Sequence, residues 1–126
     1  MSEELLRPDN SLRRLTDAEK GVLSALLQHA PQKNYDLSDM VVEDMRDGAM
    51  GSIRFSTGIH KDKRVIGRSL VEAHYQDSDG VIVSISLNID SKGQLYELDF
   101  WKVDFAPIRQ YPKPEQLRFE TTSLKS

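Results

Sequence analysis

A chain of 126 residues is long enough for one domain and leaves little room for two. Its net charge of −3 argues against a generic nucleic-acid-binding role, because such proteins carry an excess of basic residues. The absence of cysteine excludes disulfides, thiolate zinc sites, iron–sulfur clusters and a cysteine nucleophile.

The N-terminus and the apolar runs predict a cytoplasmic protein. Residues 1–4 (MSEE) are acidic and lack the order of basic and then apolar residues that a signal peptide shows. No apolar run approaches the roughly 20 residues that a membrane helix requires. We therefore expect no membrane association.

One amphipathic helix is predicted over residues 16–30, after a flexible lead-in of residues 1–14. Thr16 and Glu19 have the spacing of a capping box, in which each side chain bonds to the backbone N–H of the other residue. Apolar residues then recur at helical spacing and predict one buried face. These residues are Val22, Leu23, Leu26, Leu27 and Ala30. Pro31 ends the helix.

From Tyr35 onward the apolar period changes to two, which indicates strands. The predicted strands cover residues 40–45, 52–56, 65–75, 81–89 and 94–105. Gly48 and Gly51 lie in the turn between the first two strands, and we expect at least one of them to have a positive φ. Residues 57–64 are expected to form a polar loop.

The fold class that follows is α+β. One N-terminal helix packs on a four- to five-stranded antiparallel meander, and residues 15–110 make up this single domain. Pro107, Pro112 and Pro114 predict that residues 111–126 are an extended tail that cannot pair regularly.

Strand register divides the sheet into two faces, because neighbouring residues of a strand point to opposite sides. The expected core consists of Leu23, Leu26, Leu27, Val83, Ile85, Leu87, Leu98 and Phe100. Ser69 and Tyr96 are expected on this face, and Leu70 and Leu95 on the outer face. The expected outer rows are Glu72–Ser84–Asp99 and His74–Ile82–Trp101.

The outer face carries the candidate binding residues, which are Arg68, Glu72, His74, Glu97, Asp99 and Trp101. The acids and His74 could bind a divalent metal, or two acids could act as a glycosidase-like pair. The competing interpretation is a solvated sheet face with Arg68 and Lys102 as partners of the acids. Trp101 is either an interface anchor or is covered by the C-terminal tail.

Three segments resemble a family of small uncharacterised bacterial domains. They are residues 15–19 (LTDAE), 47–55 (DGAMGSIRF) and 95–105 (LYELDFWKVDF), and the resemblance spans roughly residues 12–109. It implies a bacterial source and a shared fold. It implies no activity, and no catalytic residue can be carried over.

The functional hypothesis is a non-enzymatic protein-binding module of the immunity or adaptor type that acts through its outer sheet face. A basic protein is the expected partner, and no cofactor or metal is expected. The alternative is a metal-assisted hydrolase or a sugar-binding protein that uses Glu72, His74, Glu97 and Asp99. A nucleic-acid contact through residues 60–64 is a third hypothesis, against which the net charge argues.

Overall fold

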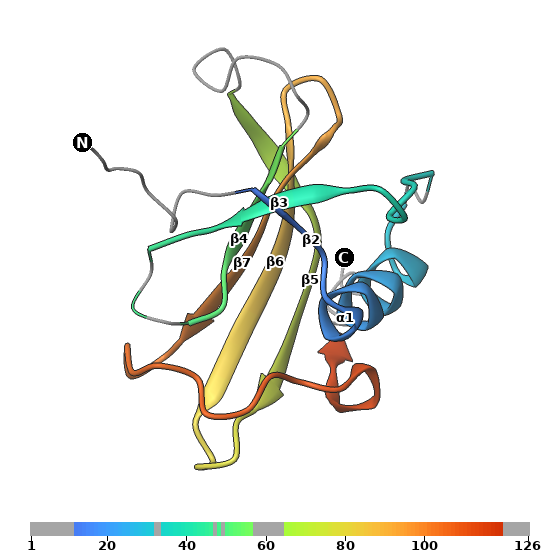
Figure 1. Ribbon diagram of the computed structural model, residues 1–126. Helices are drawn as coiled ribbons and strands as arrows, with labels where there is room; N and C mark the ends of the chain where they lie inside the picture. The colour runs from blue at the N-terminus through green and yellow to red at the C-terminus, as the bar shows by residue number, and fades with distance from the viewer. Residues whose placement is uncertain (1–11, 32–33, 47, 49, 57–64, 120–126) are drawn as a thin grey trace, which may run out of the picture.

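The computed structural model describes residues 12–31, 34–46, 48, 50–56 and 65–119. These residues form one α-helix and a seven-stranded antiparallel sheet (Figure 1). The elements are β2 (Arg13–Arg14), α1 (Asp17–Gln28), β3 (Val41–Asp44), β4 (Ile53–Ser56), β5 (Ile66–Gln76), β6 (Ile82–Asp90), β7 (Leu95–Lys102), the 3-10 helix η3 (Pro114–Gln116) and β8 (Arg118–Phe119). The predicted α+β class, with an N-terminal helix on an antiparallel sheet, is confirmed.

The strand order is β2-β3-β4-β7-β6-β5-β8, so the sheet has more strands than predicted. Only β5, β6 and β7 follow one another as a meander, and β4 pairs with β7 rather than with β5. The last two residues of the expected lead-in form β2, and the expected tail contributes β8. These short strands satisfy backbone groups that would otherwise be exposed at the edges of β3 and β5. The predictions for residues 1–11, 57–64 and 120–126 lie outside the described residues.

The start of α1 is fixed by the predicted capping box. The Glu19 N–H donates to Thr16 Oγ1 at 3.1 Å, and the Thr16 N–H donates to Glu19 Oε1 at 2.9 Å. Arg13 also binds Glu19 through two nitrogens, at 2.9 and 2.8 Å, and its guanidinium reaches Asp44 at 2.7 Å. Burial alone would raise the pKa of Glu19, but the bonds from Arg13 and Thr16 hold it below its usual value. One arginine thus joins β2, α1 and β3.

The core lies between α1 and one face of the sheet. All eight residues that the sequence assigns to the core are buried: Leu23, Leu26, Leu27, Val83, Ile85, Leu87, Leu98 and Phe100. The helix lies against β5 and η3, and Figure 1 shows the C-terminal segment, made up of η3 and β8, close to it. In the described part of the chain, no helix is both long and apolar enough to span a membrane.

Bulges change the predicted register at three places, one of them at Gly67 in β5. In β5 the pairing shifts between Ser69 and Val71, so Leu70 turns inward while Ser69 faces Asn88 on the outer side. In β7 the pairing shifts at Tyr96, so Leu95 is buried opposite Ile89. The predicted faces of Ser69, Leu70, Leu95 and Tyr96 are therefore wrong. One extra residue in a strand reverses the side of every residue beyond it.

The turn between β3 and β4 contains two glycines with the backbone conformation expected of them. Gly48 has a φ of 77° and Gly51 a φ of 99°, and the Met45 N–H donates to the Ser52 carbonyl at 3.0 Å across this turn. Glycine enters this region of φ without steric cost. The predicted positive φ in the hairpin between β3 and β4 is confirmed.

Candidate functional site

A groove runs along β6 on the face of the sheet opposite α1, and we call it the outer-face groove. Its base is β6, where Ser84 and Ser86 point outward. Longer side chains of β5 and β7 rise on either side of these serines. The groove is open to solvent and has a volume of about 760 Å³. Its lining residues are Glu72, Ala73, His74, Ile82, Ser84, Ile85, Ser86, Asp99 and Trp101. A groove forms here because short side chains lie between longer ones.

Strand pairing sets the order of residues across the groove. The observed rows are Glu72–Ser86–Asp99 and His74–Ser84–Trp101. The predicted rows had the outer residues right but placed β6 two residues out of register. The prediction places His74 beside Ile82, whereas His74 pairs with Ser84. A shift of two preserves the face of every residue, so the groove residues were still correctly placed outward.

Exposed apolar side chains gather at one end of the groove. Trp101 is 48% exposed, and its ring lies 5.9 Å from the ring of Phe105, which is 69% exposed. Ile82 and Val103 are also exposed there, and the Val103 N–H donates to the Ile82 carbonyl at 3.1 Å. Among the described residues the C-terminal segment packs near α1 and β5 and leaves Trp101 half-exposed. Clustered apolar side chains at a groove are typical of an interaction site.

The backbone around Phe105 departs from the predicted strand. β7 ends at Lys102 rather than continuing to residue 105, and the Phe105 N–H closes a turn onto the Lys102 carbonyl at 2.8 Å. Phe105 has a φ of 64°, a left-handed value that is unusual for a bulky residue. Such a conformation persists only where the surrounding structure enforces it.

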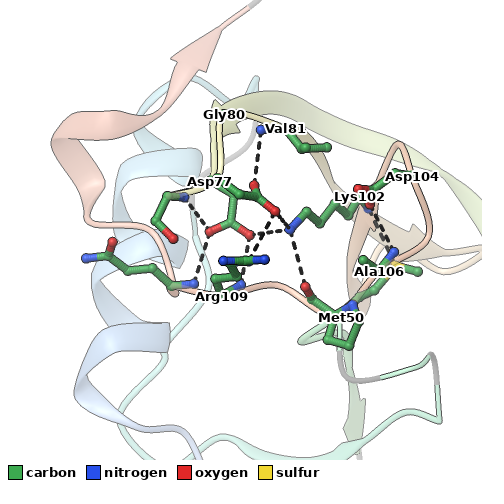
Figure 2. Close-up of polar contacts among 12 residues, drawn as sticks. Met50, Asp77, Gly80, Val81, Lys102, Asp104, Ala106 and Arg109 are labelled. Carbon is green, nitrogen blue, oxygen red and sulfur yellow. Dashed lines mark hydrogen bonds and ion pairs between the residues drawn. The ribbon is translucent and has the colours of Figure 1, made fainter.

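A buried ion pair anchors the start of this turn (Figure 2). Lys102 Nζ lies 2.9 Å from Asp77 Oδ2 and 2.7 Å from Asp79 Oδ2, and the Lys102 side chain is fully buried. The ammonium also donates to the Pro107 carbonyl at 3.3 Å. Lys102 therefore joins the turn between β5 and β6 to the segment that follows β7. The expectation that Lys102 is a surface partner of the outer acids is wrong.

Asp77 completes this buried network from the other side. Its carboxylate accepts backbone N–H groups from Ser78 at 2.7 Å, Arg109 at 2.8 Å and Gln110 at 3.0 Å. Burial opposes ionisation, but the bonds from Lys102 and these N–H groups together lower the pKa of Asp77 to about 2. The carboxylate is thus ionised at neutral pH, and it fixes the path of the chain after Phe105.

Glu97 lies on the outer face but is neutralised. Its Oε2 is 3.3 Å from the Arg54 guanidinium, which also lies over the Tyr96 ring at 5.1 Å. Glu97 is only 9% exposed. It belongs to the next row along the sheet, opposite Asn88, and does not line the groove.

Arg68 is also separated from the other candidates. The bulge at Leu70 lies between Arg68 and Glu72, and Arg68 pairs with Ile89, whose side chain is in the core, so Arg68 is not on the face of Glu72. Of the six predicted site residues, the structure gathers Glu72, His74, Asp99 and Trp101 in the groove. Within the described ranges, no three His, Asp or Glu side chains come close enough to hold a metal ion.

Sequence reasoning missed Phe105 and Val103 as parts of the site because it continued the last strand past Lys102. The signals for a turn were present. Asp104 is a common turn residue whose carboxylate accepts the Ala106 N–H at 3.0 Å, and Pro107 follows closely.

The family model for a domain of unknown function, DUF6984, matches residues 12–112 of the chain. The chain therefore belongs to this family, as the resemblance to an uncharacterised family predicts. No curated protein and no solved structure shows significant similarity to it.

Proposed function

We propose that this member of the DUF6984 family is a protein-binding module, of the immunity or adaptor type, that acts through the outer-face groove. The observation that supports the proposal best is the exposed pair of Trp101 and Phe105 beside a groove that carries two carboxylates. Tryptophan supplies a large contact area at protein interfaces, and it is enriched among the residues that dominate binding.

The chemistry of the groove favours binding over catalysis. Glu72 and Asp99 are separated by the width of two strand spacings, roughly 9.6 Å. Ser84 and Ser86 lie on a regular strand, so neither has the sharp strand-to-helix turn of a serine nucleophile. The groove combines negative charge with apolar contact area, which suits a partner with a basic and partly apolar surface.

The proposed setting follows the sequence motifs, which favour a cytoplasmic protein of bacterial origin. An acidic face would accelerate the encounter with a basic partner, because opposite potentials steer diffusion. In an immunity-type role the basic partner would be the protein that is held inactive. In an adaptor role it would be one component of an assembly.

Affinity capture with matched variants tests the proposal. The test variant is Glu72→Lys with Trp101→Ala, because both side chains project from the outer face and Glu72 pairs with no described side chain. Glu97→Lys is less suitable, since it would place two cations together at Arg54. The control is Glu115→Lys with Val65→Ala, the same two kinds of change at exposed positions outside the groove.

Wild-type protein and the control should capture the same partner from an extract of the native cells, and the test variant should lose it. Circular dichroism and thermal unfolding establish that all three are folded. Equal capture by the folded test variant would show that the outer-face groove is only a solvated surface.

A further inference from the structure

The width of the outer-face groove indicates the backbone conformation of a segment that binds in it. The β5 and β7 backbones on its two sides are roughly 9.6 Å apart, and their side chains narrow the space further. An α-helix with its side chains is about 10–12 Å in diameter, so it would rest on the side chains of β5 and β7 instead of entering between them. A single extended segment fits between the two sides. The groove residues Ile82 to Ser86 span about 14 Å along β6, which is the length of about five extended residues.

The carboxylates of the groove favour a positively charged side chain in that segment. Glu72 and Asp99 lie on either side of Ser86 in one row, and none of the described residues that line the groove is Lys or Arg. Asp99 Oδ1 also accepts a hydrogen bond from Ser52 Oγ at 3.2 Å, and this neutral donor does not cancel the charge of the carboxylate. A cation above Ser86 would lie between two carboxylates. The guanidinium of arginine is planar and carries five N–H donors, so it can bond to carboxylates on both sides at once.

The apolar end of the groove favours an apolar side chain at a second position of the segment. The Trp101 row lies next to the Asp99 row, one i to i+2 step along β7 and about 7 Å away. Alternate side chains of an extended peptide have the same spacing. An apolar side chain would therefore contact Trp101 and Phe105 when an arginine two residues away lies between Glu72 and Asp99.

On this basis, and resting on the proposed function, we infer that the outer-face groove binds an extended segment of the partner in which an apolar residue and an arginine are two positions apart. The arginine lies between Glu72 and Asp99, and the apolar residue contacts Trp101 and Phe105. The partner is thus recognised through a short linear segment rather than through a helix.

Peptide titration tests this inference without knowledge of the natural partner. The probe is a blocked pentapeptide with leucine at position two, arginine at position four and glycine elsewhere. One comparison peptide replaces arginine with citrulline, which is neutral and similar in shape, and another places leucine and arginine at adjacent positions. The indole N–H resonance of Trp101, the single tryptophan of the chain, reports binding in ¹H–¹⁵N spectra.

The arginine peptide should shift this resonance, and the citrulline and adjacent peptides should each bind about fivefold more weakly or worse. Glu72→Gln should lower the affinity for the arginine peptide about two- to fivefold, as removal of one exposed charge pair does. The control Asp39→Asn, an exposed carboxylate outside the groove, should change nothing.

Equal binding of the arginine and citrulline peptides would overturn the cation site, and equal binding of the adjacent peptide would overturn the spacing. An unshifted Trp101 resonance with every peptide would overturn the inference as a whole. None of these results decides the proposed function, because the affinity capture above tests that with the natural partner.

Discussion

Lys102 Nζ lies 2.9 Å from Asp77 Oδ2, and both side chains are fully buried. Lys102 directly follows Trp101 in β7, and the turn that carries Phe105 begins with it. The pair therefore fixes the strand end from which both aromatic residues of the groove project. An ion pair that is buried on the core side thus supports the outer face.

We expect Asp77→Ala to lower the free energy of unfolding by about 3–5 kcal/mol, because it leaves a buried ammonium without one of its partners. It also removes the acceptor of the Arg109 and Gln110 N–H groups. Urea unfolding at neutral pH measures the change. The control Asp39→Ala removes only an exposed pair with Arg14 and should cost less than about 1 kcal/mol. Equal effects of the two variants would contradict the role of the buried pair.

The same carboxylate predicts a pH dependence. The pKa of Asp77 is about 2 in the folded protein, against an ordinary value of 3.8. A lowered pKa means that the folded state releases the proton more readily, so this contribution is complete above pH 3.8. It is lost as the pH falls towards 2. Asp77→Asn should therefore lose less stability than wild type between neutral pH and pH 2.5. Parallel curves of unfolding free energy against pH would refute this assignment.

Gly67 should not tolerate a side chain. A Cβ atom there would lie 2.5 Å from the Asp90 carbonyl oxygen, which is part of the neighbouring backbone and cannot move aside cheaply. We expect Gly67→Ala to destabilise the fold by about 1–3 kcal/mol, the usual range for overpacking. Arg68→Ala, at the exposed next position, is the control and should have little effect. Thermal unfolding of both variants distinguishes a close backbone approach from a general intolerance of β5 to substitution.

The two faces of β6 can be compared through the same substitution. Ile85 is buried in the core, and Ile85→Ala should cost about 2–5 kcal/mol. Ile82 lies in the same strand on the outer face and is 37% exposed, so Ile82→Ala should cost clearly less. A larger loss at Ile82, measured by denaturant unfolding, would mean that the assignment of the faces is reversed.

The sequence was sufficient to predict the helix, its cap and the core because these depend on local periodicity. The alternation from Val83 to Leu87 and the spacing from Leu23 to Leu27 each specify one buried face. The two short edge strands were missed because a two-residue strand has no detectable period. The bulges at Leu70 and Tyr96 were missed because each adds one residue without any required composition, although Gly67 was a signal for the irregularity beside it.

The candidate site was partly predictable for the same reason. Glu72, His74, Asp99 and Trp101 were placed on the outer face by alternation alone, which held between the bulges. The predicted face of Arg68 is wrong because a bulge lies between Arg68 and Glu72. The neutralisation of Glu97 depends on Arg54 of β4, and no local pattern of residues indicates that β4 pairs with β7. The burial of Lys102 depends on a turn 25 residues earlier in the chain.

The most direct test of the outer-face groove as a protein-binding surface uses its tryptophan as a probe. Because Trp101 is the single tryptophan, incorporation of 5-fluorotryptophan yields one ¹⁹F resonance in the folded protein. Addition of the captured, unlabelled partner should shift or broaden this resonance as the half-exposed ring becomes buried. An unchanged resonance in a mixture where size-exclusion chromatography shows the complex to be formed would place the binding surface elsewhere.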